Sequence, residues 1–110
     1  MSSSSDTKLN LILQWNAFNL KRIGLLKPPA ISIYVTLLDL ANRASFSGGV
    51  TSSISVDNER LMRLSGIGSK QTLIEHRNIL IRHGFISYSS GGHFVDGKRV
   101  SGCYTIIKLY

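Results

Sequence analysis

Apolar residues recur at helical spacing in four segments of the chain, and β-branched and aromatic residues gather near its C-terminal end. We predict helices over residues 8–22, 30–44, 58–64 and 69–83, with a short strand at 54–56 and a tight turn at 65–68. A serine- and glycine-rich loop fills 45–53. This order predicts an α+β fold: a winged helix-turn-helix with an extra N-terminal helix and a long β-hairpin wing.

The helix predicted from Ala30 has one apolar stripe, so we expect it to form the centre of the core. Its expected core positions are Ile31, Tyr34, Leu37, Leu38 and Ala41. The two later helices are expected to bury Leu61, Leu64, Leu73, Leu80 and Ile81.

The first helix differs, because its apolar residues form two offset stripes. One stripe holds Leu9, Ile12, Leu13, Asn16, Ala17 and Leu20, and the other holds Leu11, Trp15, Phe18 and Arg22. A surface helix of a small domain normally needs one apolar face. Two interpretations stay open: both faces are covered within the domain, or one of them contacts a partner. On the second interpretation we predict oligomerisation contacts at Leu11, Trp15 and Phe18.

Cap and turn residues fix the boundaries of the later elements. Asp57 or Asn58 is expected to cap the third helix and Ser69 the fourth, which ends before Gly84. The Asp96-Gly97 dipeptide predicts a hairpin turn. Folding the chain about that turn pairs His93 with Val100, Gly91 with Gly102 and Ile86 with Ile107, and makes Tyr104–Tyr110 the final strand.

Length and composition narrow the class of protein. The 110 residues suit one domain, 43% of them are hydrophobic, and 17% are charged, which is too few for a disordered chain. We expect a flexible lead over residues 1–7 and one domain over 8–110. The lone Cys103, the absence of a signal-peptide pattern and the lack of a spanning apolar run predict a cytoplasmic protein.

The formal net charge of +7 favours a polyanionic partner, and nucleic acid is the first expectation. A DNA-reading helix needs side chains that donate and accept hydrogen bonds near its N-terminal end. The fourth helix offers such a face, and we predict that it binds DNA through Ser69, Lys70, Gln71, Ile74, Glu75 and Asn78.

Phosphate contacts are predicted from Arg60 and Arg63 on the preceding helix and from Lys98 and Arg99 on the wing. Arg77 lies between the inward and outward faces of its helix, so it either supports the fold or touches DNA. No histidine, cysteine or carboxylate falls into a zinc or acid–base pattern, and Gly66-Ile67-Gly68 is too short for a phosphate-cradling loop and follows a helix rather than a strand. We therefore expect neither an enzyme nor a cofactor.

Four stretches of the chain resemble the N-terminal winged-helix domain of phage replication-initiation proteins, the replisome organisers related to DnaD-type primosome proteins. They are LLDLANRASF (Leu37–Phe46), SVDNERLMRLSGIGSKQTL (Ser55–Leu73), RNILIRHGFISY (Arg77–Tyr88) and YTIIKLY (Tyr104–Tyr110). The resemblance covers about three quarters of the chain, from Pro29 to Tyr110.

The resemblance implies sequence-specific binding to double-stranded DNA repeats at a replication origin, self-association, and work in a bacterial host. It also implies recruitment of the replicative helicase or its loader, for which such proteins commonly use a second, C-terminal domain outside these 110 residues. Two alternatives stay open: a winged helix that serves oligomerisation in a primosome protein, and a transcriptional regulator.

Overall fold

A computed structural model describes residues 8–43, 50–51, 53–89, 94–95, 98–99 and 102–110. In this part the chain forms an α+β fold with four helices and a three-stranded antiparallel sheet. The helices are α1 (Leu11–Lys21), α2 (Pro28–Arg43), α3 (Asn58–Ser65) and α4 (Lys70–Arg82). The strands are β1 (Lys8–Leu9), β2 (Val50–Thr51), β3 (Ser53–Ser55), β4 (Ile86–Ser89), β5 (Phe94–Val95), β6 (Lys98–Arg99) and β7 (Cys103–Ile106).

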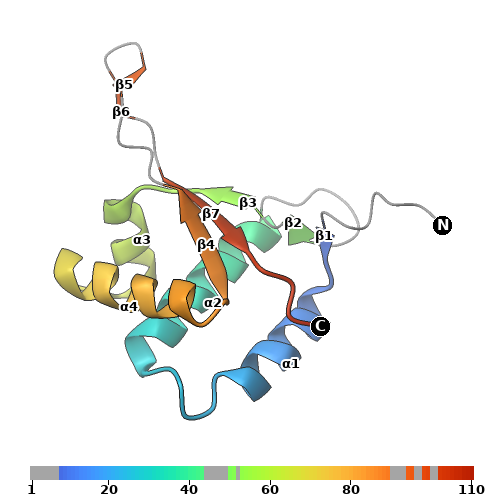
Figure 1. The fold of residues 1–110 in the computed structure, drawn as a ribbon. Helices are drawn as coiled ribbons and strands as arrows, with labels where there is room; N and C mark the ends of the chain where they lie inside the picture. Colours follow the sequence, from blue (N-terminus) through green and yellow to red (C-terminus); the bar gives the residue numbers. More distant parts are fainter. Residues whose placement is uncertain (1–7, 44–49, 52, 90–93, 96–97, 100–101) are drawn as a thin grey trace.

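The sheet has the order β3-β7-β4, so the last strand lies between the two earlier ones. The helices lie along one side of this sheet, and β5 and β6 project beyond its far end (Figure 1). We call the β5–β6 pair the distal hairpin. Two further strands, β1 and β2, pair next to the start of α1. None of the helices in the described part of the chain has the length and hydropathy of a membrane span.

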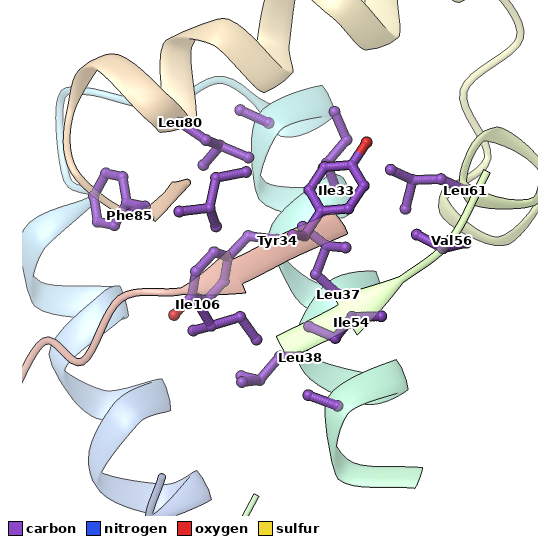
Figure 2. Packing of buried hydrophobic residues seen from close by; sticks show 14 of the residues in the cluster. Ile33, Tyr34, Leu37, Leu38, Ile54, Val56, Leu61, Leu80, Phe85 and Ile106 are labelled. Atoms are coloured by element: carbon purple, nitrogen blue, oxygen red, sulfur yellow. The ribbon is translucent and has the colours of Figure 1, made fainter. Parts of the chain in front are cut away.

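The core is built around α2, as its single apolar stripe predicts. Tyr34, Leu37 and Ala41 are fully buried, and Leu38 nearly so. Ile31 is only partly buried and packs at the edge of this cluster. Ile33 and Tyr34 lie in its middle, between Phe85 on one side and Val56 on the other (Figure 2).

The predicted start of α2 at Ala30 is two residues late. The helix begins at Pro28, since prolines fit the first helical turn, where the missing N–H has no intrahelical partner. The first helix is also shorter than the predicted range 8–22. Lys8 and Leu9 pair with Thr51 and Val50, and the side chain of Asn10 caps α1 by accepting from the Leu13 amide at 3.0 Å.

The structure confirms the predicted boundaries of α3 and α4 to within one residue. Asp57 caps α3 by accepting from the Arg60 amide at 2.7 Å, and Ser69 caps α4 by accepting from the Thr72 amide at 3.3 Å. Leu61, Leu73 and Leu80 are buried as predicted, and Ile81 is partly buried.

The prediction that Leu64 faces the core is wrong, because its side chain is 49% exposed. The helix ends one residue later, and Gly66 takes the left-handed conformation with φ of +77°. This turn directs Ile67 into the core instead, where its amide donates to the Met62 carbonyl at 3.0 Å.

The predicted hairpin register is correct at the tip and wrong at the base. Phe94 pairs with Arg99, as expected from a turn at Asp96-Gly97, but Ile86 pairs with Ile106 rather than Ile107. Four residues, 90–93, separate β4 from β5, whereas three residues, 100–102, separate β6 from β7. The two arms are therefore offset by one residue. The predicted pairs of His93 with Val100 and of Gly91 with Gly102 involve positions outside the described residues.

The final strand is shorter than the predicted Tyr104–Tyr110. It ends at Ile106, and the remaining residues run alongside α1. The side chain of Gln14 explains this path, because its Nε2 donates to the Ile107 carbonyl at 2.9 Å and its Oε1 accepts from the Leu109 amide at 3.1 Å.

Candidate nucleic-acid interface

The turn between α3 and α4 is held from both sides. Within α3, the Ser65 hydroxyl donates to the Leu61 carbonyl at 2.6 Å. From α2, the Ser32 hydroxyl donates to the Ser65 carbonyl at 2.5 Å. The turn is thus anchored to the central helix, which fixes the direction in which α4 leaves it.

The outer face of α4 brings together most of the predicted base-reading residues. Lys70, Gln71 and Glu75 are exposed, and with the half-buried Ile74 they line a shallow depression of about 500 Å³. Asn78 is exposed one turn further along the same helix. This face offers amide, ammonium and carboxylate groups around one aliphatic side chain, the mixture that base edges can engage.

Ser69 has a different part in the site. Its hydroxyl accepts the Thr72 amide, so it stabilises the N-terminal turn of α4. The first amides of a helix also favour an anion, and Ser69 lies at that end of α4.

The predicted phosphate contacts divide into two sets. Arg60 and Arg63 are exposed on α3, and neither forms an ion pair with any of the described acidic residues. Lys98 and Arg99 form β6, paired antiparallel with β5 in the distal hairpin. Figure 1 shows β5 and β6 beyond the end of the sheet that lies near α3.

The two alternatives for Arg77 are decided by its burial. It is 8% exposed, and its Nη1 donates to Asn58 Oδ1 and to the Tyr104 hydroxyl, each at 3.1 Å. Its guanidinium carbon lies 4.1 Å from the centroid of the Tyr88 ring. Arg77 therefore supports the fold. The neighbouring His76 is also 8% exposed, with no hydrogen-bond partner at Nδ1 among the described residues.

Two of the predicted oligomerisation contacts lie on the inner side of α1. Phe18 is fully buried, with its ring stacked 3.8 Å from that of Tyr34, so its assignment as a partner contact is wrong. Leu11 is partly buried against the core, and Trp15 remains 37% exposed. The exposed apolar face of α1 and the following turn is instead formed by Ile12, Leu13, Trp15, Leu20, Ile23 and Leu25.

The exposed side of α1 borders a groove of about 330 Å³ against α2. Its apolar lining comes from Leu11, Ile12, Trp15, Val35 and Leu38.

Gln14 is the main residue that the sequence reasoning missed. It is fully buried, and its Nε2 donates to the Tyr34 hydroxyl at 2.6 Å. Burial raises the pKa of Tyr34 to about 12, and this hydrogen bond opposes the rise only in part. The spacing carried a signal, because Leu11, Gln14 and Phe18 lie three and four residues apart on one helical face.

Metal chemistry gains no support from the described residues, among which no three histidine, cysteine or acidic side chains gather. Cys103 is exposed and forms no disulfide with another described residue.

Comparisons of the chain with protein-family models, curated proteins and solved structures gave no match. The likeness to replication-initiation domains therefore depends on the four sequence stretches alone.

Proposed function

We propose that this chain is a winged helix-turn-helix domain that binds double-stranded DNA sequence-specifically. The observation that carries the proposal is the outer face of α4, where Lys70, Gln71 and Glu75 surround Ile74 in an exposed depression. Helix α4 would enter the major groove, and α3 with its anchored turn would lie across the backbone. The distal hairpin would serve as the wing.

Each group on this surface has a defined role in the proposal. Gln71 and Asn78 suit the paired donor and acceptor of adenine, and Lys70 suits a guanine edge or a phosphate. Ile74 can contact a thymine methyl, and Glu75 can accept from cytosine. Arg60, Arg63, Lys98 and Arg99 would neutralise phosphates, which positions the domain without reading sequence.

We place this binding at a replication origin, in a phage-type replication initiator that acts in the bacterial cytoplasm without catalysing a reaction itself. The four sequence stretches similar to replisome organisers support this setting. Contacts with a replicative helicase or its loader would be made outside the described residues. A footprint over the replicon's initiator gene separates this role from transcriptional regulation: protection confined to a promoter contradicts it, and protection of clustered repeats supports it.

The DNA-binding proposal is tested by titrating origin duplex at low and moderate salt. The double variant Lys70→Ala/Gln71→Ala should bind the origin duplex about 10- to 100-fold more weakly, because a bidentate base contact contributes about 1–3 kcal/mol. A matched control is Asn16→Ala/Lys21→Ala, which removes one amide and one lysine from the exposed side of α1. Equal affinity of the wild type and the first variant would refute the assigned role of α4.

A second candidate function is self-association through α1, favoured by its exposed apolar face. Ile12 is 70% and Leu20 75% exposed, and no charged residue occurs from Leu11 to Leu20. The first three turns of α1 therefore add no like-charge repulsion of their own to the approach of two chains of net charge +7. The apolar groove between α1 and α2 adjoins this face, and exposed apolar surface commonly marks a protein interface.

Sedimentation equilibrium tests this second function. The wild type should be dimeric or larger, and Leu20→Glu should be monomeric, because a desolvated carboxylate disfavours an apolar interface. Arg82→Glu, an exposed change at the end of α4, is the control and should stay associated. A wild type that is monomeric at high concentration would rule the function out.

A further inference from the structure

Arg77 lies where three elements meet beneath the start of the distal hairpin. From α4 it donates to Asn58, the first residue of α3, and to Tyr104 on β7. It also covers the ring of Tyr88 on β4. Tyr88 and Tyr104 are directly opposite each other in the sheet, with ring centroids 4.7 Å apart.

Burying the guanidinium group of Arg77 costs desolvation free energy. A buried guanidinium loses hydration, and none of its described partners is a carboxylate. Its Nε has no hydrogen-bond partner among the described residues. An apolar side chain of similar size would fill the same space without these costs. What it could not supply is a set of directional contacts to α3, β4 and β7 at once.

The Tyr88 ring also contacts the returning arm of the hairpin. A Cβ added at Gly102 would lie 2.6 Å from the ring, and the ring has little room to move between Arg77 and Tyr104. The Gly102 carbonyl accepts from the Val56 amide at 3.1 Å, which ties it to the end of β3. The end of the sheet nearest the distal hairpin, at Ser89 and Gly102, therefore lies beside Tyr88 and the guanidinium group of Arg77.

We infer that Arg77 is a positioning residue that fixes the direction of the distal hairpin relative to α4. It touches no DNA in this scheme. By holding Tyr88 against Gly102, it allows the hairpin to reach the backbone of the same duplex that α4 reads. The inference rests on the proposed DNA binding for its consequence, but its geometric content can be measured without DNA.

The geometric test measures the distance between spin labels at Arg82→Cys on α4 and Val95→Cys on the hairpin, in a Cys103→Ser background and without DNA. The distance distribution should be narrow with Arg77 present and broad in Arg77→Met, which keeps an unbranched apolar stem and loses the guanidinium group. Tyr88→Phe keeps the ring and should stay narrow. An equally narrow distribution in Arg77→Met overturns the inference.

Two further variants keep the test decisive where Arg77→Met does not fold. Tyr88→Leu removes the ring, and Gly102→Ala displaces it, so both should broaden the distribution although Arg77 is intact. Narrow distributions in both folded variants would also overturn the inference.

The consequence for DNA is tested by the salt dependence of affinity. Losing the hairpin contacts of Lys98 and Arg99 should flatten the log–log slope by about two units. Arg77→Met should flatten it by a similar amount, and adding Lys98→Ala/Arg99→Ala should change it no further. A variant that is merely less stable would bind less while keeping the wild-type slope, and that outcome contradicts the inference. A wild type that binds no duplex refutes the proposed function, whereas a broadened distance distribution still supports the positioning role.

Discussion

Helices α1 and α4 both present an outer face to solvent, and the two faces have opposite chemistry. The face of α4 carries Lys70, Gln71 and Glu75, whereas that of α1 carries Ile12, Leu13 and Leu20. Each helix starts with a side-chain cap, and each buries a few large residues against α2. The comparison shows that similar docking on one central helix leaves two outward surfaces of different chemistry: a polar and charged one at α4 and an apolar one at α1.

The largest expected effect on stability comes from removing the ring that packs α1 against the core. Phe18→Ala should lower the free energy of unfolding by about 3–5 kcal/mol, because it removes a fully buried ring stacked on Tyr34. Trp15→Ala, at a partly exposed position just under one turn away on α1, should lower it by less. Denaturant unfolding of both variants checks this. An equal loss for the two would contradict this difference, because it would show that Trp15 contributes as much buried surface as Phe18.

High pH should destabilise the packing of α1 on Tyr34 in the unmutated protein. Tyrosine in an unfolded chain titrates near pH 10, whereas burial raises the pKa of Tyr34 to about 12. The raised pKa means that its contribution to stability is fully present below pH 10 and is lost as the pH rises through 12. The loss should reach roughly 2–3 kcal/mol, measured as denaturant midpoints between pH 9 and 12. Tyr34→Phe should remove this part of the pH dependence, and a profile unchanged by Tyr34→Phe would contradict the assignment.

Replacing the N-cap residues of α1 and α4 compares the two helices at the same structural position. Asn10→Ala and Ser69→Ala should each cost about 1 kcal/mol of stability, because each leaves one helix amide without its acceptor. Only Ser69→Ala should also weaken binding to duplex. Thermal melts and a duplex titration measure the two effects, and equal loss of duplex binding in both variants would argue that α4 has no special part in recognition.

The smallest effect separates α1 from α3, the helix that precedes α4, by the role of an exposed cation on each. Arg63→Ala should flatten the salt dependence of DNA affinity by about one unit, since one phosphate contact is lost. Lys21→Ala, which removes an exposed cation from the end of α1, should leave the slope unchanged. Titrations over a series of salt concentrations distinguish the two. Equal slopes in both variants would mean that long-range charge, rather than contact at α3, governs binding.

The sequence predicted α4 far better than α1, for a physical reason. Ser69, the apolar positions of α4 and Gly84 are local signals, and each determines the structure around itself. The packing of α1 depends on Gln14, whose side chain forms hydrogen bonds with a carbonyl and an amide group near the C-terminal end of the chain. Spacing placed Gln14 beside Phe18, but nothing local indicated that an amide side chain would be the one enclosed.

Two other predictions, the burial of Leu64 and the register at the base of the hairpin, were wrong because each was extrapolated from one local pattern. Leu64 has helical spacing from Leu61, but the turn at Gly66 brings Ile67 into the core instead. The base register of the hairpin was extrapolated from its turn, and equal arms cannot be assumed from a turn signal alone. Arg77 could not be assigned from spacing, because its three partners come from α3, β4 and β7.

Because the two arms of the hairpin differ in length by one residue, the number of residues in each arm determines the register between its base and its tip. Side chains alternate between the two faces of a ladder, so a one-residue change in register exchanges the faces. Deleting one residue from 90–93 would equalise the arms, so that the register of Tyr88 with Tyr104 and that of Val95 with Lys98 would coincide. Deleting one residue from each arm would shorten the reach and keep the offset. Single-residue insertions or deletions in this segment should therefore alter which groups the tip presents more than substitutions at the tip do.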